Sequence, residues 1–162
     1  MDHQGSDKPT GARRIRLRRP RKTLPGAAPG AGIGLVAPDA PKPQIRICAY
    51  NTEFLDVVTT DDAEKINQIK SQFPGRVFWI EIKGFGDKSF LEKVGADFNI
   101  HRLELDDVVN TYQRPKLEES PEHLFIVSRT INGGNDSGSH EEEAHDDQLS
   151  VFLGKDFVLT FQ

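Results

Sequence analysis

The sequence predicts an α/β (α+β) domain built on a mixed parallel and antiparallel sheet flanked by helices. β-prone runs alternate with helical patterns over residues 45–110, and two β-prone runs follow each other closely at the end of the chain. Alternating elements favour parallel pairing, whereas two strands joined by a short loop pair antiparallel. We therefore expect both kinds of pairing within one sheet.

The first two predicted elements are a strand and a helix. Residues 44–49 alternate apolar with other side chains at the period of two that a strand requires. Residues 61–73 change to a helical period, with Ile66 and Ile69 on one face. Either Asp61 or Asp62 can cap this helix, and the Pro-Gly pair at 74–75 ends it.

A buried strand and a second helix come next. Residues 77–82 (Val-Phe-Trp-Ile-Glu-Ile) are β-prone and apolar on both faces, which is typical of an interior strand. Asp87 or Ser89 can cap the helix that follows. The apolar stripe of that helix consists of Phe90, Leu91, Val94 and Phe98.

The second half begins with a short helix and continues as strands. Residues 103–110 have a helical pattern, and Pro115 ends this helix because a proline pushes the preceding residue out of the α region. Residues 123–131 and 148–153 read as strands, separated by a polar acidic loop. Gly154-Lys155-Asp156 joins residues 149–153 to 157–161 and has the length and composition of a hairpin loop.

Composition divides the chain into a tail, residues 1–43, and a single domain, residues 44–162. The tail contains Gly, Pro, Ala and Arg with few large apolar residues, so we expect it to be disordered. Residues 1–24 carry a net charge of +6 and the rest of the chain −10. A solvated tail is the simplest interpretation of the basic cluster, with anionic lipid headgroups or nucleic acid as alternatives. The cluster has no interleaved aromatic residues, so no specific nucleic-acid binding is predicted.

Several function classes are excluded or disfavoured by the residues present. The longest uncharged stretch, Thr23 to Pro38, has 16 residues and is broken by glycines and prolines, so the chain does not cross a membrane. Cys48 is the only cysteine, which excludes an internal disulfide and a zinc site of paired cysteines. No nucleophile and base stand at a recognisable spacing, so we do not expect an enzyme.

Clustered carboxylates are the candidates for metal chemistry. Glu104 and Asp107 are three residues apart and share a helical face, while Asp106 points about 100° away. Such oxygens suit a hard divalent cation such as Mg²⁺, although a solvated acidic turn is the alternative. The acidic segment 136–147 is better interpreted as a flexible linker. Residues 113–116 (Gln-Arg-Pro-Lys) fit a helix stop with surface charge, or a salt bridge between elements.

Three blocks taken together resemble the CorA family of magnesium and cobalt channels. They are Trp79-Ile80-Glu81-Ile82-Lys83-Gly84, the run from Ile100 to Lys116 that ends in Gln-Arg-Pro-Lys, and His123-Leu124-Phe125-Ile126-Val127. The closing run from Gln148 to Gln162 is similar to the same family's strand pair. The resemblance extends in order from about Ile45 to Gln162.

This resemblance implies the amino-terminal funnel domain of such a channel, on the cytoplasmic face of the cell (inner) membrane and repeated in a homopentamer. It implies that the stalk helix and the membrane helices would follow Gln162, so the chain is an amino-terminal fragment. It also implies regulatory Mg²⁺ or Co²⁺ bound between neighbouring subunits, with Asp107 as the principal ligand and Asp106 as the second-site carboxylate. A stand-alone adaptor, whose basic tail binds anionic membrane or nucleic acid, is the alternative function.

Overall fold

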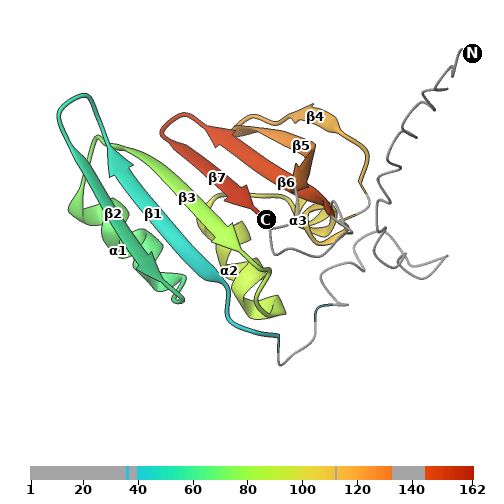
Figure 1. Cartoon of the computed structure of the whole chain (residues 1–162). Coiled ribbons are helices and arrows are strands. Elements are labelled where there is room, and N and C mark those ends of the chain that lie inside the picture. The colour runs from blue at the N-terminus through green and yellow to red at the C-terminus, as the bar shows by residue number, and fades with distance from the viewer. Residues whose placement is uncertain (1–35, 37–39, 112, 133–144) are drawn as a thin grey trace, which may run out of the picture.

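The computed structural model describes residues 36, 40–111, 113–132 and 145–162. These residues form one seven-stranded sheet with strand order β2-β1-β3-β7-β6-β5-β4 (Figure 1). The predicted disordered tail, residues 1–43, lies almost wholly outside the described residues, as does most of the acidic segment 136–147. The elements in chain order are β1 (Gln44–Tyr50), β2 (Leu55–Thr60), α1 (Glu64–Gln72), β3 (Val77–Lys83), α2 (Lys88–Asp97), α3 (Arg102–Val109), β4 (Lys116–Glu119), β5 (His123–Asn132), β6 (His145–Gly154) and β7 (Phe157–Phe161).

The predicted fold class is confirmed, because the sheet is mixed. β3 and β7 pair in parallel, while every other neighbouring pair of strands is antiparallel. The predicted hairpin is also present: β6 and β7 pair antiparallel, with Leu153 opposite Val158. The parallel pair places β3 in the interior of the sheet, as its apolar sequence predicts.

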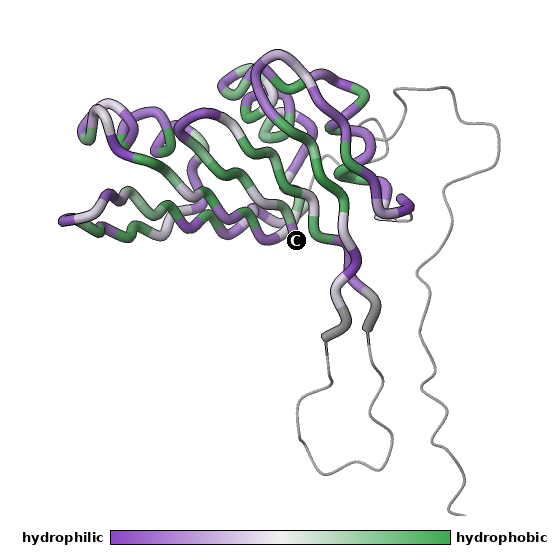
Figure 2. Tube along the Cα trace, turned by 90° about the horizontal axis from the view of Figure 1, so that it is seen from above, coloured by the Kyte–Doolittle hydropathy of each residue, from purple (hydrophilic) through white to green (hydrophobic). Residues whose placement is uncertain are grey.

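All three described helices cover the same face of the sheet (Figures 1 and 2). Alternate strand residues point to this face and are almost completely buried, as the period of two requires. Apolar residues of the helices close the core, including Leu91 and Val94 of α2 and Leu105 and Val108 of α3. The strands contribute Ile45, Ile47, Phe78, Ile80, Ile82, Phe125, Phe152, Leu159 and Phe161.

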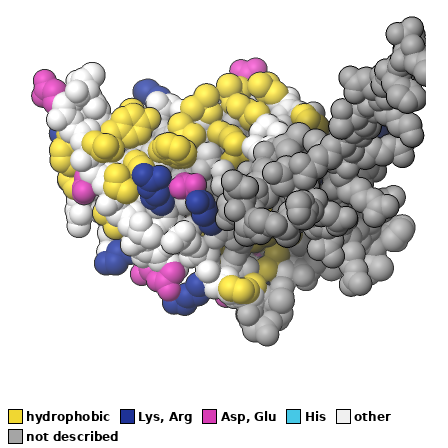
Figure 3. Space-filling model, in the orientation of Figure 1, with side chains coloured by type: hydrophobic (Ala, Val, Ile, Leu, Met, Phe, Trp, Pro, Cys, Tyr) yellow, Lys and Arg dark blue, Asp and Glu magenta, His cyan; other side chains and the backbone are white. Residues whose placement is uncertain are grey.

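The opposite face of the sheet carries no helix of the described residues and retains exposed apolar side chains (Figure 3). Val57, Trp79 and Leu153 are each 42% exposed. The strand registers place them in one row that crosses the sheet, because aligned residues on neighbouring strands point to the same side. The row consists of Val57, Cys48, Trp79, Val158, Leu153 and Leu124. β3 is therefore interior, but only one of its two apolar faces is buried.

The helix ends agree with the sequence prediction except at Pro115. Ala63, directly before α1, offers no side-chain cap, but the Asp62 carboxylate accepts the backbone N–H of Glu64 at 2.9 Å, so one of the two predicted caps is used. Asp87 caps α2 as predicted and accepts the N–H of Phe90 at 2.8 Å. α3 covers Arg102–Val109, close to the predicted 103–110, but it ends well before Pro115, so the proline does not stop it.

Candidate functional site

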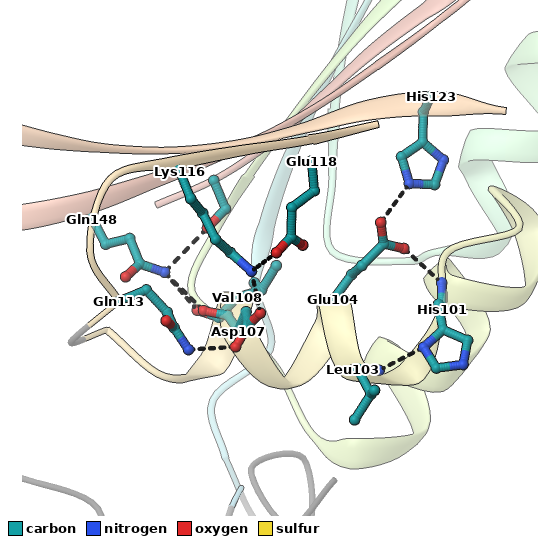
Figure 4. Close-up of polar contacts among 11 residues, drawn as sticks. His101, Leu103, Glu104, Asp107, Val108, Gln113, Lys116, Glu118, His123 and Gln148 are labelled. Atoms are coloured by element: carbon teal, nitrogen blue, oxygen red, sulfur yellow. Dashed lines mark hydrogen bonds and ion pairs between the residues drawn. The ribbon is translucent and has the colours of Figure 1, made fainter. Parts of the chain in front are cut away.

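The first turn of α3 is fixed by a reciprocal capping arrangement. His101 Nδ1 accepts the N–H of Leu103 at 3.2 Å, and Glu104 Oε2 accepts the N–H of His101 at 2.9 Å (Figure 4). Both bonds satisfy backbone donors that a helix start would otherwise leave without partners. Glu104, which the sequence offered as a possible metal ligand, is therefore used in local structure.

The second oxygen of the same carboxylate enters the protein interior. Glu104 Oε1 lies 3.1 Å from Nε2 of His123, whose side chain is only 1% exposed. His123 is the first residue of β5 and packs edge-on against Phe152. The pair thus joins the start of α3 to the sheet.

Asp107 lies one turn further along α3 and meets side chains from the segment that follows the helix. Its Oδ2 accepts a hydrogen bond from Lys116 Nζ at 2.6 Å, and its Oδ1 accepts one from the Gln113 amide (Figure 4). The Lys116 ammonium also lies 2.9 Å from Oε1 of Glu118. The salt bridge between elements, one of the two interpretations of the Gln-Arg-Pro-Lys segment, is therefore present for Lys116.

The structure does not bring Asp106 and Asp107 together at one surface. Asp106 is 8% exposed, whereas a quarter of the Asp107 side chain is exposed. The two side chains leave α3 about 100° apart, so burial of one accompanies exposure of the other. Asp107 is therefore the member of the predicted pair that solvent and ions can reach.

A side chain of β6, Gln148, hydrogen-bonds the end of α3. Gln148 on β6 is 8% exposed, and its amide nitrogen donates to the Asp107 carbonyl at 2.9 Å and to Ser150 Oγ at 3.2 Å. A helix C-terminus leaves carbonyl oxygens without intrahelical partners, so this contact satisfies one of them. It also fixes the backbone that carries the Asp107 carboxylate.

The carboxylates around Lys116 stabilise its protonated form. Partial burial by itself lowers the pKa of this ammonium. The hydrogen bonds to Asp107 and Glu118, together with their negative charges, raise the pKa by more than burial lowers it, so the pKa lies above its ordinary value. Lys116 is consequently positive at neutral pH and neutralises part of the charge on Asp107.

Among the contacts described above, the Asp107 carboxylate is the group that could contribute oxygen to a hard divalent cation. It already attracts a cation, the Lys116 ammonium, and its other oxygen accepts a hydrogen bond from the Gln113 amide nitrogen. Within the described ranges, no three His, Cys, Asp or Glu side chains converge on one point. A single reachable carboxylate suits Mg²⁺, which keeps several waters and is held through one or two carboxylates.

None of the helices in the described part of the chain is long and apolar enough to span a membrane. A family model described as CorA-like Mg²⁺ transporter protein matches residues 75–162, which is more than half of the chain. The chain belongs to this family. The family match covers β3 to β7 and includes all of the side chains around Asp107 described above.

A curated relative supports the same assignment. The chain is 33% identical over 119 residues to the cobalt/magnesium transport protein CorA of Thermotoga maritima, which covers 74% of this chain and 32% of that protein. The full-length CmaX protein shares the fold at 18% identity, with a TM-score of 0.53 over 74% of this chain and 35% of that one. The soluble domain of CorA from Methanocaldococcus jannaschii matches at 14% identity and a TM-score of 0.47, over 72% and 39% of the two chains. The aligned part of the chain thus covers about a third of the length of the proteins it matches.

The sequence does not indicate several of the side chains that surround Asp107. It allows a salt bridge for the segment with Lys116 but does not identify Asp107 as the partner, and it predicts Gln148 and His123 only as strand residues. A buried histidine and a buried glutamine at the inward positions of β-prone runs are the signals that could have found the latter two, because buried polar groups need partners.

Proposed function

We propose that this chain is the metal-sensing, regulatory part of a CorA-like transporter of magnesium or cobalt ions. The observation that carries the proposal is the partly exposed Asp107 carboxylate on α3, in a chain of this family. This carboxylate already binds a cationic group, the Lys116 ammonium. We propose Asp107 as the principal ligand of a divalent ion, with Asp106 contributing only if α3 adjusts, because Asp106 is buried.

The proposed setting is the cytoplasmic face of the cell membrane, with neighbouring subunits of a homopentamer completing the site. A single carboxylate and water give weak binding, so the remaining oxygens would come from a neighbouring subunit and a stalk helix. The matched cobalt/magnesium transport protein is about twice as long as this chain, which leaves room for those elements. We propose that helices of the longer protein also cover the apolar row of the open sheet face, since an exposed row of this kind marks an interaction surface.

The proposed regulation follows from linkage. An ion that bridges carboxylates of two subunits stabilises the arrangement in which those carboxylates face each other. Loss of the ion leaves like charges opposed across the interface and destabilises that arrangement. Depletion of internal magnesium would therefore open the pore, and binding would close it.

The test is a magnesium titration of the 162-residue chain followed by backbone amide chemical shifts. We expect saturable shifts confined to residues 105–109 and 113–118, absent in Asp107→Asn. Asp97→Asn is the matched control, because Asp97 is also a helical carboxylate paired with a lysine, Lys93, at 2.7 Å. Co²⁺ in place of Mg²⁺ should broaden the same signals, because it is paramagnetic. Shifts spread over residues 136–147 and unchanged in Asp107→Asn would contradict the proposal.

A further inference from the structure

Lys116 is placed between two carboxylates that can each hold it. Its Nζ lies 2.6 Å from Asp107 Oδ2 and 2.9 Å from Glu118 Oε1 (Figure 4). Lys116 and Glu118 are two residues apart on β4, opposite the inward-facing Val127 and Phe125 of β5, so both point to the helix-covered side. The ammonium can therefore leave Asp107 and keep an acidic partner with little movement.

The surroundings of the lysine favour such a short displacement. The Lys116 ammonium lies 5.1 Å from the centre of the Phe125 ring, so it rests against the sheet as well as between the two acids. The Glu118 side chain is 51% exposed, against 24% for Lys116 and 25% for Asp107. The lysine would consequently move toward a more hydrated partner that is already in contact.

We propose that Lys116 is an internal competitor for the divalent cation at Asp107, and that Glu118 receives its ammonium when the ion binds. This inference rests on the proposed function, since it concerns the regulation of the same site. A carboxylate oxygen bonded to an ammonium at 2.6 Å is not free to bind an ion, and two cations held there together would repel each other. Binding therefore includes the cost of breaking the Asp107–Lys116 pair, and this cost raises the ion concentration at which the site fills.

The competing explanation is that the Asp107–Lys116 pair only fastens α3 to β4. The two explanations make opposite predictions for replacement of Lys116. If the pair is only structural, replacing Lys116 leaves ion binding unchanged or weakens it, because Asp107 becomes less ordered. If Lys116 competes with the ion, replacing it strengthens ion binding, because the Asp107 carboxylate becomes free.

The experiment is a magnesium titration of the 162-residue chain and three variants, followed by the amide signals of residues 105–109. Lys116→Met, which keeps an unbranched apolar side chain against Phe125, should lower the midpoint roughly threefold or more, the scale of a partly exposed ion pair. Glu118→Gln should raise the midpoint, because the displaced ammonium loses its second acidic partner. Lys93→Met should change nothing, although Lys93 forms an equally close pair with Asp97.

The side-chain ammonium signal of Lys116 provides an independent readout. In the unsubstituted chain it should shift with the same midpoint as the amide of Asp107, since one event moves both. If Lys116→Met is poorly folded, this signal and the exposed Glu118→Gln variant decide the question.

The outcomes separate the two proposals. Binding at Asp107 with an unchanged or higher midpoint in Lys116→Met overturns the competitor and leaves the metal-sensing function standing. Absence of binding at Asp107 in every variant overturns both. Binding that becomes measurable only in Lys116→Met supports the competitor in its strongest form.

Discussion

The carboxylate of Glu104 holds His123 and the start of its own helix at the same time. One oxygen lies 3.1 Å from His123 Nε2 and the other accepts the N–H of His101 at 2.9 Å. Among the described residues, none hydrogen-bonds His123 Nδ1, so this contact is the one polar bond of a buried ring. Glu104 therefore fastens the first turn of α3 to β5, while Gln148 holds the end of the helix.

Glu104→Ala should therefore destabilise the chain by roughly 2–3 kcal/mol, combining a lost helix cap with an unpaired buried imidazole. Glu104→Gln is the matched control, because an amide can both accept the His101 N–H and bond the ring, and it should cost less than about 1 kcal/mol. Urea unfolding followed by circular dichroism measures both. Equal losses in the two variants would show that charge, and not the hydrogen bonds, is what matters.

The cap of α2 gives a prediction in acid. The pKa of Asp87 lies below its ordinary value of 3.8, first because Ser89 donates to the carboxylate and then because the Phe90 N–H does. A lowered pKa in the folded state adds stability that is present above that ordinary value and is lost as the pH falls through the folded pKa.

Asp87→Asn keeps a capping oxygen that does not titrate in this range. The stability advantage of the unsubstituted chain over this variant should therefore shrink as the pH falls from about 5 to about 2, across the titration range of a carboxyl group. Thermal unfolding at a series of pH values checks this. A difference that stays constant with pH would contradict it.

The contact between α2 and α3 depends on a glycine. A Cβ at Gly95 would lie 2.6 Å from Leu105 Cδ1, and both residues are buried. Gly95→Ala improves helix propensity by about 1 kcal/mol but overpacks this contact, so we expect a net loss of about 1 kcal/mol.

The sign should reverse once the contacting side chain is shortened. In a Leu105→Ala background, Gly95→Ala should stabilise the chain, because propensity remains and the overlap is gone. Chemical denaturation of the four chains of this cycle is the measurement. Destabilisation in both backgrounds would place the strain elsewhere.

The open sheet face predicts association. Trp79, Val57 and Leu153 lie in one row and are each 42% exposed, so the row should bind hydrophobic dyes and favour self-association at high concentration. Trp79→Gln should reduce both effects in sedimentation and fluorescence measurements. Leu103→Gln is the control, because Leu103 is similarly exposed, at 48%, but lies on α3. Equal effects of the two substitutions would contradict a role for the row.

Strong local patterns explain which elements could be predicted from the sequence. β3, α2 and the β6–β7 hairpin each combine a clear period with turn or capping residues, and all three are present. The sequence analysis does not identify β2 and β4, which are edge strands with a partner on one side only. β2 (Leu-Asp-Val-Val-Thr-Thr) contains β-branched residues that favour a strand, so its local pattern does indicate this element. β4 (Lys-Leu-Glu-Glu) has no such preference, and its pairing with β5 makes it a strand.

The candidate site could be predicted only in part, for a related reason. The spacing of Asp106 and Asp107 establishes that they point in different directions, but packing decides which of them is buried. The partners of α3 come from later strands: Lys116 from β4, His123 from β5 and Gln148 from β6. Contacts between residues so far apart in the chain depend on the strand order, which no local pattern specifies.

The parallel pairing of β3 with β7 has a consequence for how the chain folds. β1, β2 and β3 are neighbours in sequence, as are β4 to β7, so each group can assemble through short-range contacts. Phe78 meets Phe157 only after the intervening chain has been closed into a loop, which carries a large entropic cost. The two groups should thus collapse early, and their joining along this one seam should limit the folding rate, so weakening the seam would slow folding more than weakening either edge strand.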